Sequence, residues 1–288
     1  MPVPASFRRV AILGVGLVGG SIGLALRRRA PAIRVTGFDR PAVLRRARTR
    51  RAIHEGSPIL GRAVRDADLV ILALPVERIL AVLPRVARLA PPTAVLTDVA
   101  GVKSIVVRAA RRAGVGARFV GGHPMAGSER AGIGAASATL FHTAPWFLCT
   151  GRAGGEGRRA TARVERLVRR LGAVPVRVTE RVHDRSVARL SHLPQLLAVA
   201  LVNAAGRGGR ALAGTGGPAF AAMSRVALSP PGVWTGVLEG NRREIVPAID
   251  DCVRELTRLR GALDGRAGPL FRRAARTRRR LLDHGGAL

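Results

Sequence analysis

The stretch from Val10 to Asp39 constrains this chain most, because three glycines in it are spaced as Gly14-x-Gly16-x-x-Gly19. An apolar run precedes the glycines, an apolar helix-like segment follows them, and a second β-branched run ends at the acid. In a strand–turn–helix unit, glycines at this spacing permit a tight turn, close approach of the backbone to a diphosphate, and close packing of helix on strand. We therefore interpret the stretch as a dinucleotide-binding unit.

NAD is the cofactor that this unit predicts. Free N–H groups and the dipole at the start of the first helix would hold the diphosphate. The residues expected to contact it are Gly14, Gly16, Leu17, Val18 and Gly19. Asp39 stands where an acid would take both hydroxyls of the adenosine ribose, and its carboxylate would repel the 2′-phosphate of NADP. Arg40 could instead accept that phosphate, so NAD is favoured and NADP stays the alternative.

Strands alternate with helices through the first part of the chain. A continuous apolar run over 67–74 is typical of a strand buried on both faces of a parallel sheet, and Pro75 ends it. The next elements are expected to be a helix over 76–89, a strand over 94–97, a helix over 102–113 and a strand leading into Gly121-Gly122-His123-Pro124. This alternation predicts a doubly wound parallel sheet, with ligands at the carboxyl ends of the strands, where Pro75 and His123 fall.

The chain, with 288 residues, is long enough for two domains. A strand over 146–150, a helix over 160–171 and a strand over 174–178 are expected to complete the first domain. Further helices are expected over 187–204, 219–227, 233–263 and 270–282. We place the boundary near 179, which gives a Rossmann domain over 1–178 and an all-helical domain over 179–288.

The net charge of +31, with a pI near 12.0, raises nucleic acid as a partner. The arginines, however, fall where helices face water, as in 158–171, where apolar residues recur at helical spacing. No aromatic stacking platform or zinc-ligand pattern accompanies them, and Lys103 is the only lysine. A compositional bias towards arginine explains the charge more simply, so we expect neither nucleic acid nor a metal as a partner.

The cysteines and the apolar segments favour a soluble, cytoplasmic protein. Cys149 and Cys252 do not make a disulfide framework, which fits a reducing compartment. The N-terminus shows no apolar signal core. The longest apolar stretch, over 193–205, is interrupted by polar residues and a proline, so we expect it to be too short and too polar to span a bilayer.

A nicotinamide cofactor requires a partner that takes a proton from a hydroxyl as hydride leaves carbon. Histidine suits this role because its unperturbed pKa lies near working pH. His123 is the strongest of the six histidines, since a Gly-Gly-His-Pro corner holds it at the end of a strand. His183, beside Asp184, fits a capping or ion-pair role better, and His192 fits a half-buried histidine near the start of an apolar helix.

Three motifs follow the N-terminal unit in order. They read FVGGHPMAGSE over 119–129, SHLPQ over 191–195 and MSRVALSPPGVW over 223–234. From about Val10 to at least Trp234 the chain resembles the prephenate/arogenate dehydrogenases of tyrosine biosynthesis. The resemblance implies that hydride passes from ring C4 of a cyclohexadienol to NAD(P)+, while carbon dioxide leaves and the ring becomes aromatic. It also implies a helical second domain that forms a homodimer, with the active site between the domains.

The resemblance implies roles for particular residues. His123 would bind the C4 hydroxyl as base or polariser, and Arg225 would clamp a substrate carboxylate in the fork geometry that suits arginine. Locally, Arg225 is the one cation in an apolar segment and needs a partner, which an internal salt bridge could also supply. The same match gives further substrate contacts at Ser128, His192 and Gln195.

Two residues depart from the family pattern. Gly101 stands where the family usually has a serine that hydrogen-bonds the catalytic histidine, and Ser104 is a poor substitute because it would start a helix. Gln195 stands where many prephenate-using members have histidine, and an amide carries no charge. We expect oxidation of prephenate to 4-hydroxyphenylpyruvate, with oxidation of arogenate to tyrosine as the alternative.

Other classes of protein share parts of this pattern. β-Hydroxyacid dehydrogenases also join a Rossmann domain to a helical one, but they rely on a lysine there, and this chain has none after Lys103. Gly101 and the net charge keep open a non-catalytic, basic Rossmann protein that binds nucleotide or nucleic acid. Such a protein would bind with a steep dependence on salt and would make no NADH.

Overall fold

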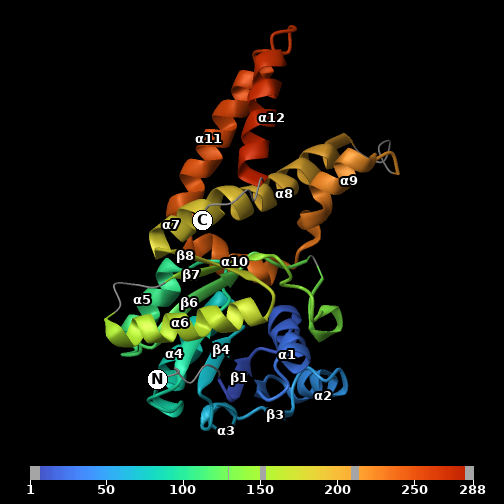
Figure 1. Cartoon of the computed structure of the whole chain (residues 1–288). Helices are drawn as coiled ribbons and strands as arrows, with labels where there is room; N and C mark the ends of the chain where they lie inside the picture. Colours follow the sequence, from blue (N-terminus) through green and yellow to red (C-terminus); the bar gives the residue numbers. More distant parts are fainter. Residues whose placement is uncertain (1–6, 129, 150–153, 209–213, 283–288) are drawn as a thin grey trace.

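The computed structural model describes residues 7–128, 130–149, 154–208 and 214–282, and it places an eight-stranded sheet between helices (Figure 1). The strands are β1 (Arg9–Leu13), β2 (Arg34–Phe38), β3 (Glu55–Ser57), β4 (Leu69–Leu72), β5 (Val95–Asp98), β6 (Phe119–Pro124), β7 (Pro145–Cys149) and β8 (Val174–Val178). Their order is β3-β2-β1-β4-β5-β6-β7-β8. The order reverses between β1 and β4, which is the position where open α/β sheets bind ligands.

Helices cover both faces of this sheet. They are α1 (Leu17–Arg29), α2 (Pro41–Thr49), α3 (Leu60–Val64), α4 (Val76–Leu89), α5 (Ser104–Arg112) and α6 (Gly155–Arg170). Alternate residues of β1 face opposite ways, so Ile12 packs in one core cluster with residues of α1 and α6, and Leu13 packs in the other with α4 and α5. The predicted burial of the central strands on both faces is confirmed.

One pair of strands differs from the predicted parallel arrangement. β7 runs antiparallel to β6, while every other neighbouring pair is parallel. A parallel return needs a crossover, usually a helix, but the described part of the β6–β7 connection has only a 3-10 turn at Ile133–Ala135. The short elements β3 and α3 had no clear sequence signal, because β3 has no buried residue and α3 is only five residues long.

The second domain is helical, as predicted. It contains α7 (Glu180–Val187), a π-helical turn (Ala188–His192), α8 (Leu193–Ala205), α9 (Pro218–Ser224), a 3-10 helix (Arg225–Leu228), α10 (Pro231–Gly240), α11 (Arg242–Arg260) and α12 (Gly268–Leu282). Figure 1 shows α11 and α12 as a hairpin that extends away from the sheet. The single helix expected over 233–263 is wrong, because the chain turns at Asn241 and the buried amide of this residue bonds elsewhere.

α10 packs the helical domain against the sheet domain. A Cβ on Gly236 would lie 2.2 Å from Glu77 Oε1 in α4, and one on Gly240 would lie 3.3 Å from the Val102 side chain. Val237, between these two glycines, is buried in the same core cluster as α4 and α5. The glycines therefore bring α10 close to α4 and α5.

The helix from Glu180 to Gly206 runs on through α7, the π-helical turn and α8. By length and composition alone it could cross a membrane, with 28% of its most apolar window buried. This corrects the expectation that the segment is too short and too polar, because α7 and the π-helical turn continue into α8 and lengthen the helix. Core helices of soluble proteins pass the same test, so one such helix is weak support for a span.

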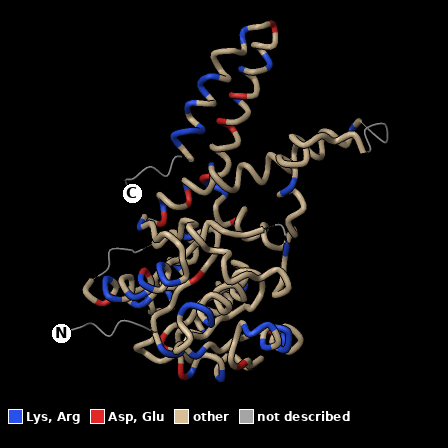
Figure 2. Tube along the Cα trace, turned by 45° about the vertical axis from the view of Figure 1, so that its right-hand side comes forward, with Lys and Arg blue, Asp and Glu red and all other residues tan. Residues whose placement is uncertain are grey.

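Basic residues occur on helices of both domains (Figure 2). In α6 the apolar positions Val164, Leu167 and Val168 are buried, and the arginines at the ends of the helix are exposed. The predicted amphipathic helix with a solvated basic face is therefore confirmed. Arg163, on the same helix, stacks over the ring of Phe7 at 4.2 Å.

Because α1 packs closely against the Ala52 backbone, a larger residue at Gly23 is predicted to lower the stability of the protein. Gly23→Ala would place a Cβ 2.2 Å from the Ala52 carbonyl oxygen, and overpacking of this kind costs about 1–3 kcal/mol of stability. Gly61 in α3 is the matched control, because its Cβ would meet only the Leu89 side chain, at 3.9 Å. Gly61→Ala should therefore stabilise the protein by roughly 0.5–1 kcal/mol. Thermal unfolding followed by circular dichroism checks both, and equal Tm values would contradict this packing.

Candidate active site

The glycine loop between β1 and α1 has the form that a dinucleotide needs. Gly14 has φ +93°, and a Cβ on it would lie 2.3 Å from the Ala73 carbonyl oxygen. A Cβ on Gly19 would lie 1.9 Å from the Gly14 carbonyl oxygen, whereas one on Gly16 would meet nothing within 4 Å. The N-cap of α1 is Gly16, which has no side chain to cap the helix, so the first N–H groups can bind an anion. Packing therefore requires Gly14 and Gly19, and Gly16 leaves space for a ligand.

Asp39 follows β2 beside this loop. Its Oδ2 accepts the Val15 N–H at 2.8 Å, and its Oδ1 accepts the Arg40 N–H at 2.7 Å. Arg40 is the exposed N-cap of α2, and Pro75 is the exposed N-cap of α4, just beyond β4. The cofactor-binding residues predicted from the sequence therefore lie at the carboxyl ends of β1, β2 and β4, along one edge of the sheet.

A fully buried ion pair lies below the next part of this edge. The side chains of Lys103 and Asp98 are both 0% exposed and contact each other. Lys103 Nζ also donates to the Gly122 carbonyl oxygen at 2.7 Å, and Asp98 Oδ1 accepts the Gly122 N–H at 3.0 Å. The pair thus joins the end of β5 to β6 at the residue before His123.

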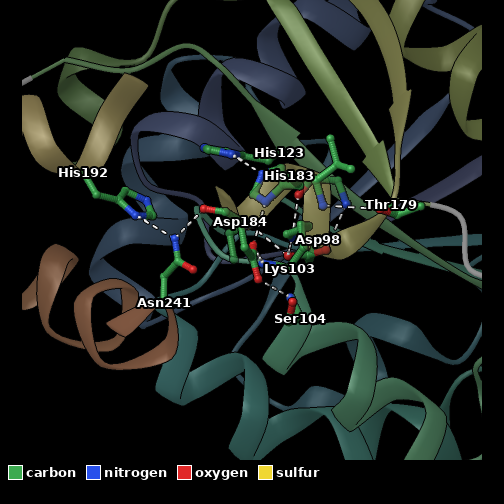
Figure 3. A network of polar contacts seen from close by, with 12 residues as sticks. Asp98, Lys103, Ser104, His123, Thr179, His183, Asp184, His192 and Asn241 are labelled. Carbon is green, nitrogen blue, oxygen red and sulfur yellow. Dashed lines mark hydrogen bonds and ion pairs between the residues drawn. The ribbon is translucent and has the colours of Figure 1, made fainter. Parts of the chain in front are cut away.

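Asp184 of α7 binds the N-terminus of α5 in the other domain (Figure 3). Its Oδ1 accepts the Lys103 N–H at 2.7 Å, and its Oδ2 accepts the Ser104 N–H at 2.9 Å. Oδ1 also lies 2.8 Å from Nδ1 of His183. Burial raises the pKa of Asp184, but the hydrogen bonds from His183, Ser104 and Lys103 outweigh it, so the pKa lies below its usual value. Asp184 is therefore a carboxylate.

His183 and His123 form the centre of this network. His183 is buried, and its Nε2 lies 2.9 Å from Nδ1 of His123. The two rings meet edge to face, with 5.1 Å between centroids, and His183 also meets the Phe147 ring edge to face at 5.3 Å. Burial lowers the pKa of both histidines, and the charge of Lys103 lowers both further. Both rings are therefore neutral.

The other ring nitrogen of His123 is open. Nε2 makes no hydrogen bond with any residue that the structure describes, and the His123 side chain is half-buried. A Cβ on Gly101 would lie 3.8 Å from this nitrogen and 3.5 Å from the Val237 side chain. These are ordinary contacts, so the packing at position 101 would accept a small side chain.

His192 lies on the side of the network nearest α10. It is buried, and its Nδ1 accepts from Nδ2 of Asn241 at 3.1 Å, while the same Nδ2 donates to the Asp184 carbonyl oxygen at 2.8 Å. The Trp234 ring meets His192 edge to face at 5.9 Å. Burial lowers the pKa of His192 to about 4, although a hydrogen bond with the Gly101 backbone raises it. His192 is thus a neutral residue with internal partners.

The other predicted substrate contacts lie outside this network. Gln195 is buried in α8 and donates from Nε2 to the Val226 carbonyl oxygen at 2.9 Å. Arg225 is an exposed residue of the 3-10 helix that this bond holds. Ser128 lies on the exposed segment after β6, where its hydroxyl accepts the Arg130 N–H at 3.1 Å. The substrate roles of these residues stay predictions.

Sequence reasoning missed several members of the network. The sequence distinguishes Lys103 only as the sole lysine, and Asp98 only follows the strand expected over 94–97. His183 contacts Asp184, but as a neutral hydrogen-bond donor rather than the expected ion pair or cap, and its contact with His123 was not foreseen. A His-Asp pair and a single lysine in an arginine-rich chain are weak signals, because their partners lie up to 81 residues away.

Comparison with known proteins identifies the family. Residues 22–180 match the nucleotide-binding domain of prephenate dehydrogenase, and residues 179–277 match its dimerization domain. The chain belongs to the prephenate dehydrogenase family. The family predicted from the three motifs is therefore confirmed, and with it a nicotinamide-dependent dehydrogenase.

Relatives of known name differ in substrate. The chain is 31% identical over 261 residues to prephenate dehydrogenase of Bacillus subtilis, covering 87% of this chain and 69% of that protein. Prephenate dehydrogenase from A. aeolicus, in complex with hydroxyphenyl propionate and NAD+, matches with a TM-score of 0.83 at 25% identity, over 98% and 100% of the two chains. Arogenate dehydrogenase of Synechocystis matches with a TM-score of 0.74 at 28% identity, over 93% and 96%. Family membership thus does not choose between the two substrates.

The buried ion pair should stabilise this member of the family only when both partners are present. Lys103→Met leaves the Asp98 carboxylate buried without its cation, which should cost about 3–5 kcal/mol of unfolding free energy. The exposed pair Arg34–Glu55, with side chains 65% and 66% exposed, supplies the control. Arg34→Met should cost no more than about 1 kcal/mol. Urea denaturation measures both, and a small effect of Lys103→Met would mean that solvent reaches Asp98.

Proposed function

We propose that this protein oxidises prephenate to 4-hydroxyphenylpyruvate with NAD+, and that His123 takes the proton from the ring hydroxyl. The observation that carries the proposal is the open Nε2 of a neutral His123 at the carboxyl end of β6. β6 runs parallel to β5, which is parallel to β4 and β1, so His123 and the glycine loop share one edge of the sheet. A base and a dinucleotide at the same edge suit hydride transfer.

Each part of the chain has a distinct role in this reaction. The glycine loop and Asp39 would hold a nicotinamide cofactor, which would supply the acceptor for the hydride from ring C4. His123 binds the C4 hydroxyl through Nε2 and takes its proton as the C–H bond breaks. Loss of carbon dioxide then makes the ring aromatic, which makes the oxidation effectively irreversible. The residues buried below His123 hold its ring fixed, so that little reorganisation is needed at the reacting atom.

Arg225 is proposed to bind a substrate carboxylate, in line with its place in the MSRVALSPPGVW motif. Support comes from Gln195, which fixes the 3-10 helix of Arg225 through the Val226 carbonyl oxygen. Ser128 and His192 are proposed as further substrate-side residues. His192 would act through the position of Trp234 and the Gly101 backbone, which it contacts.

Arogenate is the alternative substrate. Gln195 stands at the position where many prephenate-using members have histidine, and its amide is neutral and already bonded to Val226. It therefore offers no charge with which to tell a keto group from an amino group. The Synechocystis relative is named an arogenate dehydrogenase, which keeps this alternative open.

NAD is the proposed cofactor, rather than NADP. The Asp39 carboxylate is oriented by two backbone N–H groups beside the glycine loop, and its negative charge would repel a 2′-phosphate. We also propose a homodimer and a cytosolic protein. The dimerization-domain match and the exposed apolar residues of the helical domain, such as Leu263 and Phe271, support the homodimer. The two free cysteines support the cytosol.

The first test is formation of NADH, followed by absorbance, when NAD+ is mixed with prephenate and then with arogenate. His123→Ala should lower kcat by about 10²–10⁴-fold, the usual contribution of general acid–base catalysis, while NAD+ binding is retained. His142→Ala, at an exposed histidine, is the matched control and should leave kcat unchanged. Full activity of His123→Ala would exclude His123 as the base.

Arg225→Ala tests the carboxylate clamp. Loss of a charge-assisted hydrogen bond should remove roughly 1.5–3 kcal/mol of transition-state stabilisation, which lowers kcat/KM by about 10- to 150-fold. Arg158→Ala, on the exposed face of α6, is a control for loss of one positive charge. An unchanged kcat/KM in Arg225→Ala would show that the guanidinium has a structural role instead.

A further inference from the structure

The protons of the buried network can be placed from its contacts. The Asp184 carboxylate can only accept hydrogen bonds, and its Oδ1 lies 2.8 Å from Nδ1 of His183. Nδ1 of His183 therefore carries a proton. Because the ring is neutral, its Nε2 has a free lone pair and can only accept.

The same reasoning extends to the next ring. Nε2 of His183 lies 2.9 Å from Nδ1 of His123, so His123 must donate its Nδ1 proton across this contact. Because His123 is also neutral, its single proton is used there, and Nε2 keeps a lone pair. This is the nitrogen that has no partner among the described residues and that lies beside Gly101.

We propose that Asp184 and His183 are positioning residues that fix the tautomer and orientation of His123, so that Nε2 is the atom that accepts the substrate's hydroxyl proton. This inference rests on the proposed function. In the reaction the O–H bond of the substrate breaks and an Nε2–H bond forms. His123 then carries a proton on each nitrogen, and its Nδ1–H stays bonded to His183.

The charge that develops on His123 has a fixed counter-charge. The Asp184 carboxylate lies one ring away, and its own position is set by N–H groups of Lys103 and Ser104 at the start of α5. The proton taken from the substrate stays on Nε2 of His123. No proton has to pass to Asp184, because His123 and His183 each keep the proton that they already bear on Nδ1. A charge on His123 is opposed by burial of the ring and by the charge of Lys103.

The lack of a side chain at Gly101 explains why the His123 ring is held at its Nδ1 edge. Gly101 has no side chain with which to hold the Nε2 edge of the ring. The Nδ1 edge is held instead, by a histidine that packs against Phe147 and is tied to a carboxylate. His123 is therefore oriented through its Nδ1 contact with His183, and Nε2 stays free for the substrate.

The tautomer can be measured without turnover. Ring ¹⁵N chemical shifts of the histidine-labelled, full-length protein at neutral pH should show His123 protonated on Nδ1 and unprotonated on Nε2. Spectra of His123→Asn assign its signals. A protonated Nε2 on a neutral His123 would overturn the proposal, even if the enzyme oxidises prephenate.

Two variants of His183 test the role in catalysis. Gln can place an amide oxygen near the position of Nε2 and accept from His123, whereas Leu can accept nothing. We expect His183→Leu to lower kcat by about 10²-fold or more with little change in KM, and His183→Gln to recover most of the loss. If the role of His183 were purely structural, both variants would lose kcat equally, in step with the fall in their Tm. That result would overturn the proposal, and so would full activity of a folded His183→Leu.

The two proposals fail separately. If the wild-type protein makes NADH but His123 has the other tautomer, the proposed function stands and the positioning role of His183 and Asp184 is wrong. If His123 has the expected tautomer but the wild-type protein oxidises neither prephenate nor arogenate, the proposed function is wrong and the assignment of the protons stands. Should His183→Leu fail to fold, the wild-type tautomer together with the activity of His183→Gln decides the proposal.

Discussion

The contact on which the site depends is the Asp184 carboxylate at the N-terminus of α5. A helix begins with N–H groups that have no partner within the helix, and here a carboxylate from another domain satisfies two of them. This is the usual chemistry of a helix N-cap, except that the acceptor lies about 80 residues further along the chain. The same carboxylate binds His183. This interaction therefore helps to join the helical domain to the sheet domain, and it also holds the ring next to His123.

The buried polar groups form a continuous layer between the sheet and α7. Asp98 and Lys103 hold Gly122, and the Lys103 backbone holds Asp184. Charges removed from water stabilise a fold only when each has its partners, so such a layer tolerates few alternative arrangements. The rigidity that results lies next to His123, the proposed base, for which a fixed geometry would matter most.

Membership of the prephenate dehydrogenase family and the local differences in this chain are compatible. The Gly-His-Pro corner and the helical domain lie within the regions that match the family. Gly101 leaves no side chain beside Nε2 of His123, and the described hydrogen-bond contact of the ring lies at its opposite edge, with His183. Gln195 is bonded to the turn that carries Arg225 rather than exposed as a charged ligand. Differences of this kind alter which groups hold the site and leave its place in the fold unchanged.

Local patterns in the sequence predicted the central strands and the glycine loop, and they singled out His123 as a base, a role that stays a prediction. Strand burial and helical periodicity depend on residues a few positions apart, and the glycine spacing reports a single turn. The break at Asn241 and the reversal of β7 were not visible, because both arise from contacts or connections over longer distances. Tertiary structure alone decided that Asp184, His183, Lys103 and Asp98 meet behind His123. No local pattern states which buried polar groups will pair, since that depends on how separate helices and strands pack together.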